Sequence, residues 1–460
     1  MISTVKIISF IIVSLFNILF MNAQPVNVDM ILKSIVEPEF KDSIFNVMEY
    51  VALNDGVKDA RTAINNSITE CSNGGGGIVL VPPGKYYVAG SIIMKSNVNL
   101  KIEEGAEIIF SVNLKDYTPF VLTLFEGTEL FNFSPLVYGY HVSNIAITGK
   151  GILNGNATAG FATWRPQGSA NQNRLRQMGI DQVPVNKRNF GQDSNLPPDM
   201  IQFFGCNNIL IQDIHILDSP YWVIHPVLCT NVTVRGIQIN SYNLNNDGCD
   251  PEYTRNVLIE NCIFNVGDDA IALKAGRDQD GWRIGRPTEN IIIRNCMFNS
   301  NCNGLCIGSE MSAGVQNVFM ENVVVKNSLS GIYFKSNPDR GGFIRNIWIR
   351  NVTCDSVRTA LIRFETNYKG GRGGFYPTLF ENFLIENVHG DVSGDCGFYA
   401  VGIEKYPLKD ITLKNICLTK CKTPYILKNT QHVKFENVIL GGVKMPVNPE
   451  ETQETQLNTY

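Results

Sequence analysis

Alternating apolar and polar positions recur along the chain from about residue 140 onward. Each unit starts with Asn or a polar substitute and continues with β-branched residues, as in NNILIQDIHI, TNVTVRGIQI, RNVLIENCIF and ENIIIRNCMF. A period of two predicts strands with one buried face. The units start at Asn208, Asn231, Asn256, Asn290, Asn317 and Asn346. This spacing is too irregular for a propeller and lacks the helices of a leucine-rich repeat, so it predicts a solenoid.

The predicted fold is therefore all-β, a right-handed single-stranded parallel β-helix whose coils differ in loop length. The right hand follows from the crossover rule for parallel strands. The leading Asn side chains should stack and hydrogen-bond in ladders between coils. Apolar residues at helical spacing over Asp59–Cys71 predict a short N-terminal capping helix that covers the first coil.

The two ends of the chain differ in composition from the repeats. Lys6 precedes the apolar run Ile7–Phe20, and a small-residue site follows, which is typical of a signal peptide over residues 1–23 and predicts secretion. The β-helix domain is expected over residues 24–445. The polar and acidic residues 446–460 are expected to form a disordered tail.

One insertion, roughly residues 157–198, interrupts the repeats and is rich in Gly, Gln and Asn. Its basic residues are Arg165, Arg174, Arg176, Lys187 and Arg188, against the acidic Asp181 and Asp193. Such a basic loop is either a wall for an anionic ligand or a solvated insertion. The net charge of −4 argues against a nucleic-acid partner, which would normally require a basic face. An acidic polysaccharide would therefore need cations gathered locally in a cleft.

The twelve cysteines do not follow a metal-binding pattern. Cys262 and Cys296 stand in matching contexts one coil apart, and Cys354 stands in a similar context further on. These positions predict free cysteines packed as small apolar residues in the core. We expect no metal, no cofactor, no nucleic-acid or membrane partner, and a monomer.

Acidic residues gather on two adjacent predicted coils. They are Asp247, Asp250, Glu252, Asp268 and Asp269. Asp268 and Cys302 each lie twelve residues after an Asn start, so they should stack on neighbouring coils, about 4.8 Å apart. Carboxylates this close cannot all ionise freely, and a protonated acid beside ionised partners suits glycoside hydrolysis. A Ca²⁺ site and ordinary turn chemistry remain alternatives from the spacing alone.

The chain resembles glycoside hydrolase family 28, the polygalacturonase-like pectin hydrolases, over nearly all of its length after residue 23, and it looks closest to the exo-acting branch. The matching phrases are NDGVKDARTAI, SPYWVIHPV, NNDGCDPE, RNVLIENCIF, GDDAIALKAGRDQDG, IGSEMSAGVQNVF and KSNPDRGG. The resemblance implies a pectin-lyase-like solenoid, hydrolysis of α-galacturonide linkages in pectin, and inversion of the anomeric centre. It assigns Asp268 as the general acid and Asp247 and Asp269 as the pair that activates water.

The resemblance also suggests substrate-binding residues, with two departures. The family usually shows Gly-His-Gly where this chain has Cys302 between two Asn, and Arg-Ile-Lys where it has Tyr333, Phe and Lys335. A Cys and a Tyr cannot pair with a substrate carboxylate as His and Arg do. Asn245 should orient its Asp, Tyr333 should offer a stacking face to a sugar, and Lys335 and Arg340 are candidate carboxylate contacts. Less specific candidates are Lys274, Arg277 and His225.

These departures leave other functions open. The site suits a hydrolase specific for rhamnogalacturonan, where one neighbouring sugar has no carboxylate, or a non-catalytic glycan-binding relative. A β-helical pectate lyase is the enzymatic rival, and its chemistry needs Ca²⁺ and an Arg base.

Overall fold

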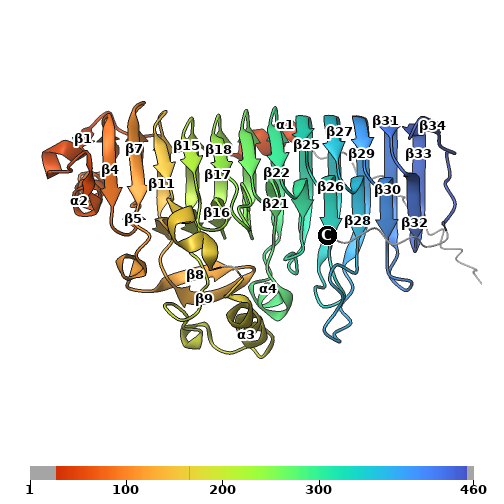
Figure 1. The fold of residues 1–460 in the computed structure, drawn as a ribbon, viewed down its shortest axis with the longest axis horizontal. Coiled ribbons are helices and arrows are strands. Elements are labelled where there is room, and N and C mark those ends of the chain that lie inside the picture. Colours follow the sequence, from red (N-terminus) through yellow and green to blue (C-terminus); the bar gives the residue numbers. More distant parts are fainter. Residues whose placement is uncertain (1–26, 165, 453–460) are drawn as a thin grey trace, which may run out of the picture.

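The computed structural model describes residues 27–164 and 166–452, and it shows a β-helix of coils stacked along one axis (Figure 1). Among these residues, every pairing between named strands is parallel except β8 with β9 and β33 with β34. The predicted all-β, right-handed parallel β-helix is confirmed. The predicted signal peptide lies outside the described residues.

Most strands belong to one long sheet that wraps two faces of each coil. Its strands are β1 Ile44–Asn46, β2 Asp55–Asp59, β3 Gly77–Val81, β4 Gly84–Val88, β6 Val98–Ile102, β7 Ala106–Phe110, β11 Ser143–Thr148, β12 Ile152–Asn154, β14 Asn207–Gln212, β15 His215–Leu217, β17 Thr230–Arg235, β18 Gln238–Ser241, β19 Arg255–Glu260, β20 Ile263–Val266, β22 Thr288–Arg294, β23 Met297–Ser300, β25 Val315–Lys326, β27 Phe343–Val357, β29 Leu379–Ser393, β31 Leu408–Lys420, β33 Thr430–Leu440 and β34 Val443–Lys444.

The third face of the coils carries two shorter parallel sheets. Their strands are β5 Ile92–Ile93, β10 Val137–Tyr140, β13 Ile201–Phe204 and β16 Ile224–Val227, then β21 Ile271–Leu273, β24 Asn303–Ile307, β26 Ser330–Lys335, β28 Ala360–Glu365, β30 Cys396–Val401 and β32 Thr423–Lys428. Single bridges from Ile224 to Cys249 and from Cys249 to Ile271 join the two sheets. The segment around Cys249 is therefore a rung of this face that lacks a full strand.

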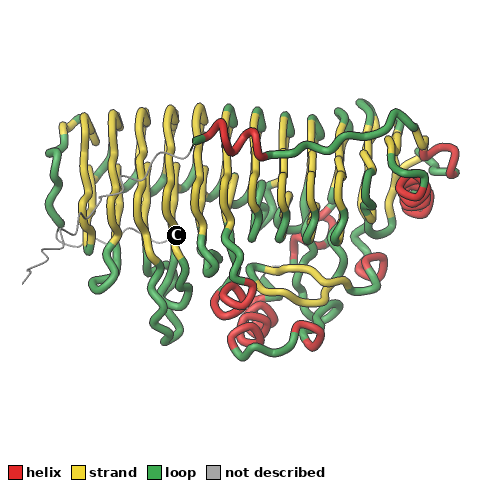
Figure 2. The backbone as a smooth tube through the Cα atoms, turned by 180° about the vertical axis from the view of Figure 1, so that it is seen from behind, coloured by secondary structure: helices red, strands yellow, loops and turns green. Residues whose placement is uncertain are grey.

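Helices cap and flank the solenoid. They are α1 Val28–Ser34, α2 Arg61–Asn73, α3 Ser169–Ile180 and α4 Asp278–Ile284, with the 3-10 helices η1 Val47–Tyr50, η2 Leu114–Tyr117, η3 Ala157–Ala159, η4 Phe161–Thr163 and η5 Val185–Lys187. The capping helix predicted over Asp59–Cys71 is α2, whose apolar face packs on the first coil. Seen from behind, α1 lies across the outer face of the long sheet (Figure 2). No described helix is long and apolar enough to cross a membrane.

The predicted Asn ladder is confirmed. Nδ2 of each residue donates to Oδ1 of the Asn on the preceding coil at 2.8–3.2 Å, through Asn97, Asn144, Asn208, Asn231, Asn256, Asn290, Asn317, Asn346 and Asn382. Each of these residues has a positive φ, between 54° and 65°. Asn tolerates this left-handed conformation better than most residues. Its side-chain amide can at the same time donate a hydrogen bond to the Asn of one neighbouring coil and accept one from the Asn of the other.

The interior of the solenoid is an apolar column that runs through all the coils. All the described cysteines are free, and Cys262 and Cys296 are buried on adjacent coils, as is Cys354 further along. The prediction of cysteines as core residues is confirmed for these three. At the C-terminal end, the backbone N of Thr452 donates to the backbone O of Leu427, and the backbone N of Leu427 donates to the Thr452 hydroxyl, so Thr452 lies against the last coils. Residues 453–460 of the predicted tail lie outside the described residues.

The insertion is a folded lobe, in contrast to the expected loop. It contains α3 and packs beside the hairpin of β8 Val121–Phe125 and β9 Thr128–Asn132 and beside α4 (Figure 1). The guanidinium of Arg188 is buried and binds Asp280 of α4 at 2.8 and 3.0 Å. Such a buried charge pair fixes the lobe in place, because either charge left alone would be costly.

Candidate active site

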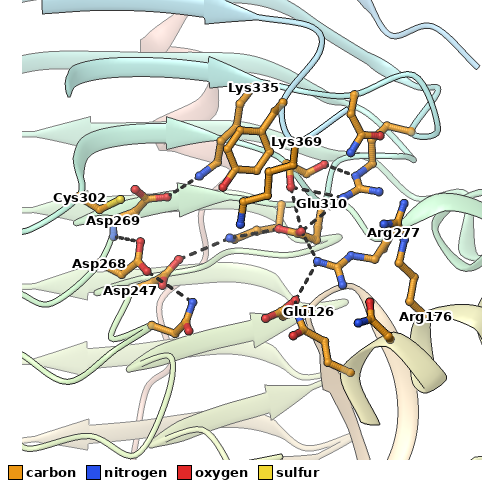
Figure 3. Close-up of a pocket in the computed structure, with 18 of the residues that line it drawn as sticks. Glu126, Arg176, Asp247, Asp268, Asp269, Arg277, Cys302, Glu310, Lys335 and Lys369 are labelled. Atoms are coloured by element: carbon orange, nitrogen blue, oxygen red, sulfur yellow. Dashed lines mark hydrogen bonds and ion pairs between the residues drawn. The ribbon is translucent and has the colours of Figure 1, made fainter. Parts of the chain in front are cut away.

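A cavity of about 420 Å³ lies where this lobe meets the third face of the coils (Figure 3). Ionisable side chains dominate its wall. The carboxylates are Glu126, Asp247, Asp268, Asp269 and Glu310, and the cations are Arg176, Lys274, Arg277, Lys335, Arg340, Lys369 and Arg372. A protein of negative net charge thus gathers cations at one place, as an anionic ligand would require.

Successive rungs of the β-helix stack the three aspartates. The backbone N of Gly248 donates to the backbone O of Asp269, and the N of Asp268 donates to the O of Asn246. A Cβ on Gly248 would lie 2.5 Å from the backbone O of Ala270, so only glycine lets these two rungs pack this closely. The local sequence therefore places Asp247 on the rung next to Asp268 and Asp269.

Asp269 is held in the ionised form. Nζ of Lys335 lies 3.1 Å from its Oδ2, and Nδ2 of Asn303 donates to its Oδ1 at 2.5 Å. Burial alone would raise the pKa of Asp269, but Lys335, Lys274 and the Asn303 amide outweigh burial and lower it. Asp269 is thus an anion throughout the neutral range.

Asp268 lies in a different environment. Its carboxyl accepts from its neighbour's backbone N at 2.9 Å and from Nδ2 of Asn245 at 3.4 Å. No cationic nitrogen of the described residues lies within 4.0 Å of it. Burial and the charge of Asp269 raise the pKa of Asp268. Of the aspartates on this rung, Asp268 is therefore the one that favours a proton.

Lys274 lies at the centre of a second cluster of acids. Its Nζ is 3.4 Å from Asp247, 3.4 Å from Glu310 and 3.7 Å from the buried Asp250. The same ammonium lies 4.4 Å from the ring centroid of Trp222. Burial first, then Asp250 and Asp268, raise the pKa of Asp247 well above its ordinary value, and Lys274 opposes them. Asp247 and Asp250 therefore share one cation, and the charge of either acid disfavours ionisation of the other.

Cross-links between distant segments form part of the cavity wall. Arg176 of α3 binds Asp278 at 2.6 Å and Asp339 at 3.3 Å. The guanidinium of Arg372, in the loop after β28, donates to Oδ1 of Asn173 of α3 at 2.6 Å. The insertion and the loop are thereby tied together beside the cavity.

Further cations line this part of the wall. Arg277 binds Glu126 at 2.8 Å and Glu310 at 2.5 Å. The buried Arg340 donates to the backbone O of Ser309 at 2.6 Å. Burial, then Arg176 and Arg277, lower the pKa of Arg372. This mutual repulsion of cations is what a bound anion would relieve.

The structure brings most of the sequence-predicted residues together. Asn245, Cys302, Lys335 and Arg340 all line the cavity with the three aspartates, and so do the less specific Lys274 and Arg277. Asp268 and Cys302 lie on neighbouring coils, as the spacing predicted, because the strands on either side keep the same register.

Tyr333 does not line the cavity, in contrast to its expected role as a stacking face. It is 3% exposed, its hydroxyl donates to Glu365, and the guanidinium of Arg363 covers its ring at 4.6 Å. Tyr368, which does line the cavity, packs edge-on against it. His225 is also internal, held between Asp199 at 2.8 Å and Glu252 at 3.1 Å.

Of the basic residues in the insertion, only Arg176 is among the described residues that line the cavity; Arg165 lies outside the described residues. Sequence analysis missed several further lining residues. They are Glu126, Gln172, Asn173, Trp222, Glu310, Tyr368, Lys369 and Arg372. Two signals were available: the run GGRGG after Lys369, which is typical of a loop near a ligand, and the motif phrases SPYWVIHPV and IGSEMSAGVQNVF, which contain Trp222 and Glu310.

The donor set does not fit a Ca²⁺ site. The ligand atoms of Asp268, Asp269 and Cys302 lie within 4.8 Å of one another. Ca²⁺ takes six to eight oxygen ligands, whereas this group offers two carboxylates and a thiol. The ammonium of Lys335 already occupies the place of a cation beside Asp269.

Comparison with known proteins gives consistent matches over most of the chain. Residues 110–438 match the family model "Glycosyl hydrolases family 28", and residues 44–103 match "Rhamnogalacturonase A/epimerase, pectate lyase-like". The chain is 27% identical to a "Probable polygalacturonase" of Vitis vinifera, over 89% of this chain and 83% of that protein. It is 26% identical to an "Exo-poly-alpha-D-galacturonosidase" of Dickeya chrysanthemi, over 88% and 72%.

Comparison with solved structures agrees with these sequence matches. An exopolygalacturonase from Thermotoga maritima superposes with a TM-score of 0.88 at 35% sequence identity, over 91% of this chain and 96% of that one. Two further exopolygalacturonase and polygalacturonase structures, from Yersinia enterocolitica and Erwinia carotovora, are 19% and 21% identical and share the fold, each with a TM-score of 0.66.

Proposed function

The chain belongs to family 28 of the glycosyl hydrolases, and we propose that it hydrolyses α-galacturonide linkages of pectin, from a chain end and with inversion. The observation that carries the proposal is the division of charge among the three aspartates. Asp247 and Asp269 each contact a lysine, at 3.4 and 3.1 Å, while Asp268 contacts none. Asp268 thus has no cation that favours its ionised form, whereas a lysine favours the carboxylate form of Asp247 and of Asp269. Glycoside hydrolysis requires a protonated acid beside carboxylates.

These environments suggest the roles. Asp268 protonates the oxygen of the leaving sugar as general acid. Asp247 and Asp269 orient a water and accept its proton as the water attacks the anomeric carbon. Asn245, which donates to Asp268, orients the acid. In family 28, as in the sequence resemblance, attack by water on the face opposite the leaving group inverts the anomeric centre.

The cations of the wall support a uronate substrate. Seven lysine and arginine side chains line the cavity, and carboxylate groups on successive sugars are the natural partners of such a wall. Among the described residues, neither the ammonium of Lys369 nor the guanidinium of Arg372 has a carboxylate partner within 4.0 Å, and the guanidinium donates to the neutral Asn173 instead. Both cations can therefore pair with a carboxylate of the substrate. Lys335 and Arg340 also line the cavity and add two buried positive charges to it.

The connection between the loop after β28 and the insertion supports attack at chain ends. Because Arg372 and Asn173 tie these two segments together, we expect that a polymer does not pass beyond this wall. A terminal sugar fits against it while the rest of the chain leaves through the open side. A run of apolar residues after Lys6 supports export, so we further propose that the enzyme acts outside the cytoplasm.

One observation favours a second candidate, a hydrolase of the same family specific for rhamnogalacturonan. The neutral Cys302 lines the cavity beside Asp268, and Tyr333 is buried behind the wall. The sugar bound next to Cys302 therefore meets no cation from these two positions, which suits a sugar without a carboxylate.

The test is product analysis on polygalacturonan and rhamnogalacturonan separately, in the presence of EDTA. The wild type should release monogalacturonate from polygalacturonan, as the β-anomer by immediate proton NMR, because inversion of an α-linkage gives β. Asp268→Asn keeps the shape but not the proton, so its kcat should fall by about 10²–10⁴-fold. The exposed Asp355→Asn is the matched control and should keep wild-type kcat.

Other outcomes are equally informative. Release from rhamnogalacturonan alone would assign the second candidate. An unsaturated product that EDTA suppresses would indicate a lyase. No product from either polymer would contradict hydrolysis of these substrates and leave a glycan-binding role.

A further inference from the structure

Asp250 is a fully buried acid that lies behind the cavity. It is 0% exposed and does not line the wall, whereas Asp247, three residues earlier, does. The two carboxyl groups lie within hydrogen-bonding reach of each other. The nearest cationic nitrogen is Nζ of Lys274, 3.7 Å from Asp250.

No donor lies between these two acids among the described residues. Both oxygens of Asp250 and Oδ1 of Asp247 are buried without a hydrogen-bond partner. Two carboxylates in contact repel each other, and each buried oxygen would lack a donor. A single proton placed between them removes both penalties, because one carboxyl then donates to the other. The pair is therefore stable with one proton and one negative charge.

The surroundings decide which acid holds that proton. Lys274 lies 3.4 Å from Asp247 and farther, at 3.7 Å, from Asp250. Asp199 and Asp269 also face Asp250 and repel a negative charge there, and Asp268 and Asp269 do the same at Asp247. Asp247 borders the cavity, where water can solvate an anion, while Asp250 has no solvent contact. The negative charge is thus less costly on Asp247.

We propose that Asp250 is a positioning residue that stays protonated at neutral pH and donates a hydrogen bond to Asp247, keeping Asp247 ionised. The effect on catalysis rests on the proposed function, in which Asp247 helps to activate water. Burial, Asp199 and Asp269 raise the pKa of Asp250 well above its ordinary value, while Lys274 and the hydrogen bond with Asp247 lower it. Because Lys274 is shared with Glu310, the hydrogen bond from Asp250 supplies stabilisation that Lys274 alone does not.

The first measurement does not depend on activity. The infrared carbonyl stretch of protonated carboxyl groups is compared at pH 7 between the wild type, Asp250→Asn and the exposed control Asp355→Asn. Asp250→Asn should lose one protonated carboxyl from this band, and Asp355→Asn should lose none. An unchanged band in Asp250→Asn would place the proton elsewhere and overturn the proposal, whether or not the protein hydrolyses pectin.

The second measurement is the pH profile of kcat/KM. The amide of Asp250→Asn still donates to Asp247, so kcat should fall by no more than about threefold. Asp250→Leu cannot donate, so the pKa of Asp247 should rise and the acid limb should move up by about one pH unit. If folded Asp250→Asn loses as much kcat as Asp250→Leu, Asp250 acts as an anion and the proposal is wrong. Inactive wild type would instead contradict only the proposed function.

Discussion

Replacing Lys335 by Gln removes the ammonium that holds Asp269. Lys335 is 7% exposed, and its only ion-pair partner among the described residues is Asp269, at 3.1 Å. The Asn303 amide would still donate to Asp269, but the positive charge would be lost. Burial would then raise the pKa of Asp269, because burial opposes the charged form and Lys335 counteracts burial more strongly than any other neighbour does.

The magnitude follows from the distance and the burial. Two charges 3.1 Å apart attract by about 5 kcal/mol at an effective dielectric constant near 20, before their desolvation is counted. Removing one partner of a buried pair costs about 3–5 kcal/mol of the free energy of unfolding. An opposite charge at this distance lowers the pKa of an aspartate by about 1–3 units, so the acid limb of kcat/KM should rise by at least about one unit.

The stability effect has a defined sign with pH. The pKa of Asp269 is lowered in the folded state, so the ion pair stabilises the fold above the ordinary aspartate pKa and loses this effect as pH falls through the lowered value. The free energy of unfolding, measured with urea, should therefore differ most between wild type and Lys335→Gln near pH 7 and converge at acid pH. The exposed Lys420→Gln is the control. An acid limb that does not move in folded Lys335→Gln would refute this reasoning.

Variants at three further positions test other parts of the structure. Arg372→Gln removes the hydrogen bond from the Arg372 guanidinium to Asn173 of α3. The KM for oligogalacturonides should then rise about tenfold, and longer products should appear by chromatography. An unchanged KM and unchanged products would contradict a role of Arg372 in closing the cavity. Burial alone would lower the pKa of His225, but its two acid partners raise it to about 9. Its contribution to stability is therefore full below pH 6.5 and is lost as pH rises through about 9, so His225→Gln should destabilise strongly at pH 6 and weakly at pH 10. Equal losses at both pH values in thermal unfolding would exclude an ionic role. Asn317→Gly loses two ladder hydrogen bonds, which should lower the free energy of unfolding by about 2 kcal/mol. Asn317→Val loses the same bonds and also places a β-branched residue at a positive φ, which should cost about 1–3 kcal/mol more. Equal urea midpoints for these two variants would argue against the backbone strain.

The repeat is what made the fold predictable from sequence. Period-two alternation and recurring Asn starts specify strands and their register locally, because each coil repeats the same turn and the same ladder contact. Asn256 and Asn290 fix two coils, and the same offset then places Asp268 beside Cys302. The acids, Lys335 and Arg340 followed from motif resemblance on this scaffold.

The residues that form the cavity wall could not be predicted in full, because contacts between residues far apart in the sequence bring them together. Glu126 reaches Arg277 across 151 positions, and Arg372 reaches Asn173 across 199. Tyr333 was misplaced because a strand pattern does not show that Arg363 and Tyr368 cover its ring.

The amino-acid sequence by itself thus determined the coils, their stacking and the cluster of aspartates, since these arise from short-range repetition. Only the tertiary structure decided that the insertion folds into a lobe, that Arg372 ties this lobe to the loop after β28, and which aspartate has a lysine beside it. The physical reason is that ion pairing and burial depend on which distant side chains share a small, poorly solvated volume, and that volume exists only after the chain has folded.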